Sequence, residues 1–111
     1  MGNDSMESTG PNANESPVVE HDVDRHRFTI SIAGGERSGF LDYRPLGDDA
    51  WDLTYTYVPR QDRGGGIGRD LVLRVLDHAR EHGLTVVPTC GFVATVIDEN
   101  PDYKDLLRET R

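Results

Sequence analysis

The segment WDLTYTYVPRQDRGGGIGRDLVLRVLDHAREHG, residues 51–83, contains the change of pattern that decides the fold. At its start, large apolar side chains alternate with polar ones, which predicts a strand with one buried face over residues 51–57. After Gly68 the apolar spacing becomes that of an amphipathic helix, which Gly83 ends as a left-handed cap. The apolar stripe of this helix consists of Ile67, Leu71, Val72, Val75, Leu76 and Ala79.

Two further strands precede this segment. Apolar and polar residues alternate over residues 28–32, and residues 38–44 form the next strand after a turn at Gly34-Gly35. A second turn, over residues 45–49, leads into the strand at 51–57. Because these strands are joined by short turns, the sequence predicts an antiparallel three-stranded meander.

The residues after the helix predict one more strand and two more helices. Residues 84–87, Leu-Thr-Val-Val, are apolar except for Thr85, as in a strand that is covered on both faces. Residues 92–97 are expected to form a short helix, and Pro101 begins a last helix whose Leu106 and Leu107 face the core. The expected order is β-β-β-α-β-α-α, which is a mixed α/β (α+β) fold.

The composition fits one small globular domain with an acidic tail. The chain has 111 residues, of which 35% are hydrophobic and 29% are charged. Residues 1–22 contain five acidic residues and no Lys or Arg. We therefore interpret residues 1–22 as a disordered acidic tail and residues 23–111 as the folded domain.

Charge and apolar patterning exclude several classes of partner. The formal net charge is −8, whereas a protein that binds nucleic acid needs a basic face. The sequence has no run of about 18 apolar residues that spans a membrane, and no secretory signal peptide is recognisable. Its single cysteine, Cys90, cannot form an internal disulfide. We expect a cytoplasmic protein with no nucleic-acid or membrane partner, and the oligomeric state stays open.

A glycine-rich loop, Arg63-Gly64-Gly65-Gly66-Ile67-Gly68-Arg69, separates the strand from the helix. Glycines allow successive backbone N–H groups to point into one concavity, and the helix N-terminus adds partial positive charge. The two flanking arginines supplement that charge. Such a loop is suited to a pyrophosphate, and the alternative is a flexible turn at the entry of the helix.

Two other phosphate-binding motifs do not fit this loop. A P-loop requires Gly-Lys-Ser/Thr, and no lysine lies near. The dinucleotide fingerprint requires a further glycine where Arg69 or Leu71 stands, and it requires an acid at the end of the next strand, which residues 84–87 lack. The pattern that fits is Arg-x-x-Gly-x-Gly, formed by Arg63, Gly66 and Gly68.

This loop resembles the acetyl-CoA pyrophosphate loop of the GNAT superfamily of N-acetyltransferases. The chain is similar in particular to the small stand-alone GNAT-like family, from about Phe28 to Leu107. The resemblance rests on ordered blocks, which are DLTYTYVP at 52–59, RGGGIG at 63–68, VPTCGFV at 87–93 and NPDY at 100–103.

The resemblance implies a minimal GNAT-like fold that binds acetyl-CoA, its cosubstrate, in a cleft between splayed strands. The strand that ends at Val58 is expected to pair its backbone with the pantetheine arm, and Cys90 is expected near the thioester. The residues implied to bind the coenzyme are Val58, Arg63, Gly64, Gly65, Gly66, Ile67, Gly68 and Arg69.

The chain departs from the family pattern at two places. The family commonly has His-Thr where Tyr55-Thr56 stands here, which puts a histidine-based acid/base role in doubt. A basic residue often follows the first loop glycine, whereas this chain has Gly65, which weakens the expected attraction for phosphate.

Acetyl transfer to an amine requires a neutral amine, a polarised thioester carbonyl and a protonated leaving thiolate. Cys90 is a candidate nucleophile that forms an acetyl-enzyme, provided that its pKa is lowered. The alternatives are a small buried thiol and direct attack by the amine, with Cys90 as a bystander. Tyr103 is a candidate proton donor to the departing thiolate, and its alternative role is core packing beside Pro101.

Other polar residues receive weaker assignments. Thr54 and Thr56 are candidates for the wall of the acceptor cleft, whereas the tyrosines at 55 and 57 are expected to pack in the core with Trp51 and Leu53. The four histidines are interpreted as solvated side chains without a role. No third ligand accompanies the helical pair at 78 and 82, so no metal site is predicted.

The sequence therefore favours an acetyl-CoA-dependent N-acetyltransferase whose acceptor is a small-molecule amine or a lysine-like side chain. The overall negative charge favours a basic acceptor through electrostatic steering. Two rival hypotheses stay open, which are a CoA-binding module without efficient turnover and a non-enzymatic protein-interaction domain.

Overall fold

The computed structural model describes residues 18–32 and 37–108 of the chain. The sheet contains β2 (Val18–Asp22), β3 (Arg27–Ile32), β4 (Arg37–Leu46), β5 (Ala50–Tyr57) and β6 (Thr85–Val87), in that spatial order. The helical elements are η2 (Arg60–Asp62), α2 (Ile67–Glu81), α3 (Gly91–Glu99) and η3 (Pro101–Leu106). Neighbouring strands from β2 to β5 are antiparallel, and β6 pairs with β5 in parallel.

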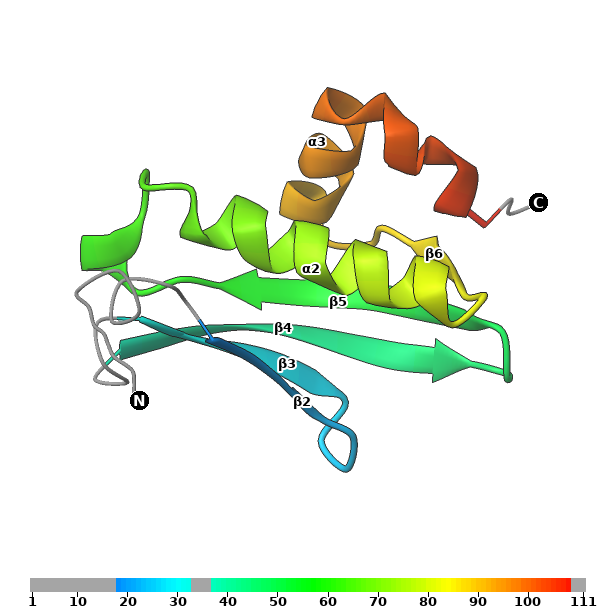
Figure 1. Ribbon diagram of the computed structural model, residues 1–111, viewed down its shortest axis with the longest axis horizontal. Coiled ribbons are helices and arrows are strands. Elements are labelled where there is room, and N and C mark those ends of the chain that lie inside the picture. Colours follow the sequence, from blue (N-terminus) through cyan, green and yellow to red (C-terminus); the bar gives the residue numbers. More distant parts are fainter. Residues whose placement is uncertain (1–17, 33–36, 109–111) are drawn as a thin grey trace, which may run out of the picture.

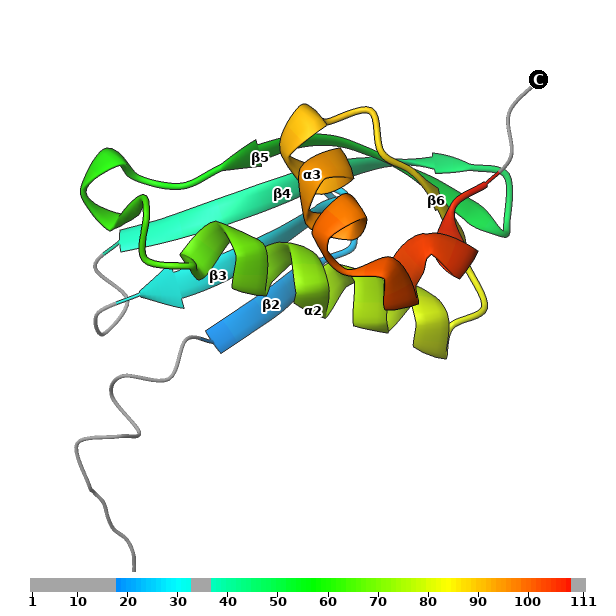
Figure 2. The same ribbon diagram turned by 90° about the horizontal axis from the view of Figure 1, so that it is seen from above.

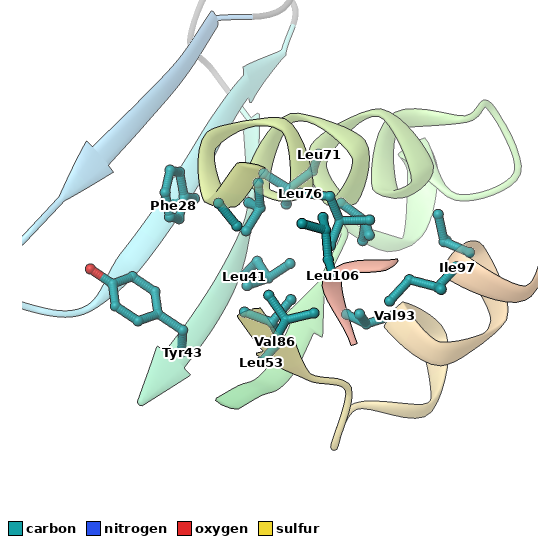
Figure 3. Close-up of a cluster of buried hydrophobic side chains, with 14 of the residues drawn as sticks. Phe28, Leu41, Tyr43, Leu53, Leu71, Leu76, Val86, Val93, Ile97 and Leu106 are labelled. Carbon is teal, nitrogen blue, oxygen red and sulfur yellow. The ribbon is translucent and has the colours of Figure 1, made fainter. Parts of the chain in front are cut away.

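The helices lie together on one face of the sheet (Figures 1 and 2). The predicted apolar stripe of α2 is confirmed, because Leu71, Val72, Val75, Leu76 and Ala79 are all fully buried. Between the sheet and the helices these side chains meet a layer of strand residues and residues of α3 and η3 (Figure 3). The mixed α/β fold is therefore held by one continuous hydrophobic core. None of the helices among the described residues is long and apolar enough to cross a membrane.

The folded part begins earlier than the expected boundary between residues 22 and 23. Strand β2 pairs with β3 from Val18↔Ser31 to Asp22↔Arg27, so residues 18–22 do not belong to a disordered tail. The strand was not recognised because one of the two side chains that face the core is a histidine, His21, beside the aliphatic Val19. The remainder of the predicted tail, residues 1–17, lies outside the described residues.

Most other elements agree with the sequence-based expectations, with small shifts in their bounds. Pro45 belongs to β4 and not to the following turn, which is centred on Gly47 at a φ of 68°. The last helix, η3, is a 3₁₀-helix rather than an α-helix. The expected cap at Gly83 is confirmed by its positive φ of 69°. The turn expected at Gly34-Gly35 lies outside the described residues.

A β-bulge changes the phase of β5. Tyr43 of β4 pairs with Leu53, whereas the preceding Asp42 pairs with Tyr55, so Thr54 is an extra residue in β5. An extra residue turns every later side chain to the opposite face of the strand. The hydroxyl of Thr54 donates a hydrogen bond to the Asp42 carbonyl at 3.1 Å, across the bulge.

The bulge corrects the prediction that both later tyrosines of β5 pack in the core. Tyr55 and Tyr57 are 52% and 36% exposed, respectively, and lie on the face of the sheet away from the helices. Their rings contact Phe40 on that same face, at centroid distances of 5.9 and 5.5 Å. Thr56, between them, takes the side that faces α3. The alternation before the bulge gave no sign of this exchange.

Two of the four histidines, His21 and His78, are part of a packed cluster, which corrects the expectation that they have no role, whereas His26 and His82 are exposed. The His21 ring stacks on Phe28 with centroids 4.1 Å apart, and its Nε2 lies 2.6 Å from the hydroxyl oxygen of Tyr43. His78 of α2 stacks on Trp51 and lies 5.1 Å from His21, ring to ring. In the described part of the chain, no three acidic, Cys or His side chains are grouped so as to hold a metal ion. Strand β2 is thus docked through an aromatic cluster that contains titratable rings.

We predict that stability decreases on acidification because of this cluster. Burial, followed by the charges of His78 and His82, lowers the pKa of His21, and burial followed by His82 lowers that of His78, while Asp22 and Glu81 oppose these shifts. The unfolded chain therefore binds more protons just below the ordinary His pKa of 6.5. Stability is fully present above that value and is lost as the pH falls through it towards the lowered pKa values. Urea unfolding between about pH 7.5 and about pH 5.5 measures the loss, at about 1.4 kcal/mol per unit of pKa difference.

The matched variants of this experiment are His78→Gln and His26→Asn. The first removes one of the two perturbed rings and is expected to flatten the pH dependence. The second replaces an exposed residue at a φ of 56°, which asparagine tolerates, and it removes only the last of the causes that lower the pKa of His21, so it is expected to retain most of the pH dependence. Equal pH dependence in both variants would contradict the assignment to the cluster.

Candidate functional site

The site lies where β5 and β6 diverge. Their parallel ladder runs only from Ala50↔Thr85 to Asp52↔Val87. One further link follows, in which the Cys90 N–H donates to the Leu53 carbonyl at 2.9 Å. Beyond this point β5 continues to Tyr57 while the chain after β6 turns into α3. Figure 1 shows β5 continuing along the sheet while the chain after β6 rises into α3.

A cavity of about 610 Å³ occupies the region of this divergence. Its walls are residues 55–58 of β5 and the chain just after it, residues 62–64 and Gly66 of the glycine loop, the first turn of α2, and Phe92 of α3. Seven of the predicted site residues line it, namely Thr56, Val58, Arg63, Gly64, Gly66, Gly68 and Arg69. Gly65 and Ile67 belong to the same loop without contributing to the lining.

The glycine loop has the backbone geometry expected of an anion-binding nest. Gly64 and Gly66 both have a φ of 87°, a left-handed conformation that favours glycine, and Gly66 is the N-cap of α2. A Cβ atom at either glycine would meet nothing within 4 Å, so the space beside the loop is open. Alternating left-handed residues next to a helix N-terminus direct N–H groups and partial positive charge toward that space.

Gly68 is required for a different reason, which is close packing. A Cβ atom there would lie 3.1 Å from Val58 Cγ2 and 3.1 Å from Phe92 Cε2. The first turn of α2 therefore packs directly against Val58, just after β5, and against Phe92 of α3. This contact fixes the inner wall of the cavity.

Two arginines stand at the mouth of the loop, and both already have partners. Arg63 donates from Nε to the carbonyl oxygen of Val58 at 2.8 Å. Arg69 forms an ion pair with Glu99 at the end of α3. Both guanidinium groups line the cavity and are largely exposed, so each can reorient toward an anion.

Cys90 lies at the inner end of the divergence. It is the N-cap residue of α3, and its Sγ is 3.6 Å from Thr56 Oγ1. Burial raises the pKa of this thiol, but the Thr56 hydroxyl and the backbone N–H groups of Phe92 and Val93 outweigh that effect and lower it overall. The N-terminal turn of α3 therefore favours the thiolate form of Cys90 through its backbone N–H groups.

A buried carboxylate, which the sequence did not single out, anchors the segment before Cys90. Asp52 is only 8% exposed, accepts a hydrogen bond from the Thr89 hydroxyl, and lies 3.5 Å from the Arg44 guanidinium. These contacts join residues 88–90 to β5 just before the two strands separate. In the sequence, the alternation over residues 51–57 marks Asp52 only as a polar strand residue, and it gives no sign that its carboxylate is buried.

Two candidate residues from the sequence are placed elsewhere. The Tyr103 hydroxyl donates to the Asp77 carboxylate at 2.6 Å on the C-terminal half of α2, and this hydrogen bond, with burial, raises the pKa of Tyr103. Tyr103 packs against the core and is not part of the cavity lining, which favours the core-packing role. The Thr54 hydroxyl donates its hydrogen bond to the Asp42 carbonyl at the bulge. The structure therefore does not bring either residue to the cavity.

Several lining residues were missed by the sequence reasoning. Tyr55 and Tyr57 reach the cavity only because of the bulge, for which the sequence carries no recognisable signal. Phe92 lines it because α3 begins at Gly91, directly after the Cys90 N-cap, so its ring lies over Gly68. Asp62 also contributes to the wall.

Comparison with known proteins identifies the family. Residues 27–106 match the family described as GCN5-related N-acetyl-transferase. Protein NATD1 of Gallus gallus is 36% identical over 83 residues, which are 75% of this chain and 76% of that protein. Protein NATD1 of Xenopus tropicalis is 32% identical over 101 residues, 91% of each chain. The fold is similar to the NMR solution structure of a GCN5-like protein from Staphylococcus aureus, with a TM-score of 0.63, 22% identity, and coverage of 89% of this chain and 93% of that one.

The fold and its glycine loop define the chain as an acetyltransferase of the GNAT class. The chain belongs to the GCN5-related N-acetyltransferase family. The resemblance inferred from the four sequence blocks is thereby confirmed.

We predict that Gly68→Ala destabilises the protein by about 1–3 kcal/mol, because the added methyl group overpacks the junction of β5, α2 and α3. Gly65→Ala is the matched control in the same loop, since its Cβ would lie 3.7 Å from the Asp62 carbonyl oxygen, an ordinary contact. Denaturant unfolding of both variants measures the difference. Equal stability of the two variants would show that the junction is not closely packed.

Proposed function

We propose that this protein binds acetyl-CoA in the cavity between β5 and α3 and transfers the acetyl group to an amine. The observation that carries the proposal is the continuity of the cavity. It begins at the left-handed glycines at the N-terminus of α2 and ends at the Thr56 side chain, whose hydroxyl is next to Cys90. A long ligand with an anionic end and a thioester end matches that arrangement.

The glycine loop would hold the pyrophosphate. Backbone N–H groups of residues 64–68 would supply donors, and Gly65 and Ile67 would contribute in this way although neither residue is part of the cavity lining. Arg63 and Arg69 would exchange their present partners for phosphate oxygens, which are better matched to a guanidinium group. The backbone of β5 up to Val58 is free of β6 here and would pair with the amide groups of the pantetheine arm.

The lowered pKa of Cys90 supports a covalent route. The Cys90 thiolate would attack the thioester carbon, the C–S bond to coenzyme A would break, and the CoA thiolate would take a proton from solvent. A neutral amine would then attack the acetyl carbon, break the bond to the Cys90 Sγ and lose a proton to solvent. In the alternative route the amine attacks acetyl-CoA directly, and Cys90 forms no covalent bond with the acetyl group.

The acceptor is proposed to be a basic molecule, either a small amine or a lysine-like side chain, because the chain has a net charge of −8. A cytoplasmic location is proposed with it, since the one cysteine is a free thiol. A second candidate function is a CoA-binding module without efficient turnover. It is favoured by the lining of this cavity, which contains no histidine. Tyr55 stands at the position where the family pattern has a histidine.

We expect saturating acetyl-CoA to raise the thermal midpoint of the wild-type protein by several degrees. A ligand at about 100 times its dissociation constant adds about 2.7 kcal/mol of stability. Gly66→Glu is expected to abolish this shift, because it places a carboxylate in the nest. Gly47→Glu is the matched control, since Gly47 has a similar φ of 68°, open surroundings and a position in the remote β4–β5 turn.

Both variants are expected to lose some stability from backbone strain, and only the first to lose the response to ligand. The same measurement with coenzyme A alone tests the module without turnover. An unchanged midpoint of the wild-type protein in acetyl-CoA would contradict the proposed function.

Single-turnover incubation with acetyl-CoA tests the covalent route. We expect intact-mass analysis to show a species about 42 Da heavier whose acetyl group maps to Cys90. Cys90→Ala is expected to lose this species and at least about 100-fold in transfer rate, because the nucleophile is absent. Retention of transfer by Cys90→Ala would assign the reaction to direct attack by the amine.

A further inference from the structure

An aromatic surface adjoins the cavity on the face of the sheet away from the helices. Figure 1 shows that the helices lie together on the opposite face. The aromatic surface consists of the rings of Tyr55 and Tyr57, backed by Phe40, and is called the aromatic wall here. The two tyrosines are 52% and 36% exposed, respectively, and both line the cavity. Neither ring is used by the coenzyme contacts proposed above.

Three successive residues of β5, whose side chains lie on alternate faces of the sheet, line the cavity. Thr56, next to Cys90, lines it from the side of the helices, whereas its two neighbours line it from the other side. The bulge at Thr54 is what places the tyrosines there. A small molecule held against the aromatic wall can therefore extend a group around the strand edge toward the Thr56 hydroxyl.

The wall already interacts with cations of the chain. The Arg27 guanidinium carbon lies 3.8 Å from the centroid of the Phe40 ring, and two hydrogen bonds to Asp42, at 2.6 and 3.2 Å, hold it there. Arg63 lies 5.9 Å from the centroid of Tyr57. The faces of such rings favour ammonium groups.

The chemistry of the reaction restricts which ammonium group can be held. The amine that attacks the acetyl group must be neutral, so it cannot itself profit from a cation–π contact. A stable contact with the aromatic wall therefore requires a second charged group on the acceptor. Resting on the proposed function, we propose that the acceptor is a small aliphatic diamine or polyamine, with Tyr55 and Tyr57 as the residues that select it.

The first experiment measures binding without turnover. The ¹⁵N-labelled protein, saturated with coenzyme A, is titrated with diaminobutane and, separately, with butanediol, a neutral molecule of the same length. We expect diaminobutane to shift the NMR signals of Tyr55 and Tyr57 and butanediol to leave them in place. Shifts located elsewhere, or equal shifts with both compounds, would overturn the proposal.

The second experiment measures transfer from acetyl-CoA to diaminobutane and to butylamine. We expect a higher kcat/KM for the diamine, by about 2- to 5-fold for each ring that contacts the second charge. Tyr55→Leu and Tyr57→Leu are expected to reduce this preference, and Tyr55→Phe, which keeps the ring, to restore it. Val23→Ala, at an exposed apolar residue far from the cavity, is the control for loss of exposed apolar surface.

The outcomes separate this proposal from the proposed function. If acetyl-CoA does not bind, the proposed function fails, whereas diamine shifts confined to the aromatic wall would still support a cation site. If acetyl-CoA binds and transfer shows no preference for the diamine, the acceptor class is overturned. A concentration-dependent dimer that Tyr55→Leu abolishes would also overturn it, because a second copy of the chain would then cover the wall.

Discussion

The rest of the structure depends on the short parallel ladder between β5 and β6. It ends at Asp52 and Val87, and the Cys90 N–H closes it with one bond to β5. Had the ladder continued, the free edge of β5 would be covered, and no cavity would separate it from α3. The buried Asp52, tied to Thr89 and Arg44, holds the two strands together at the last point before they part. The cavity thus exists because the pairing of β5 with β6 ends at Asp52 and Val87.

The parts of the fold that repeat a simple period were predictable from the sequence. The stripe of α2 and the strand at residues 84–87 follow from apolar spacing alone, and both are present. The glycine loop was also recognisable, because few structures other than a tight nest require glycines at such density before a helix. The four sequence blocks together pointed to the right family, which a single motif would not have done.

The residues that were misplaced share a physical reason, which is that tertiary packing decided them. A bulge leaves the local pattern of hydrophobicity unchanged while it exchanges the faces of a strand, so the exposure of Tyr55 could not be read from alternation. His21 counts as a polar residue in a hydrophobicity pattern, yet its ring stacks on Phe28 and packs as an aromatic core residue does. Tyr103 was near the right place in the sequence, but its partner is Asp77, far from the cavity lining.

The contact at Gly68 has a consequence for how the site can vary. At Gly68, which carries no side chain, the first turn of α2 meets the end of β5 and the first turn of α3. The spacing between these elements is therefore set by how closely the side chains of Val58 and Phe92 approach the Gly68 backbone, and it leaves little room for a larger residue there. Changes in ligand preference must then arise on the outer wall, at residues such as Tyr55 and Tyr57, while the inner wall stays constant.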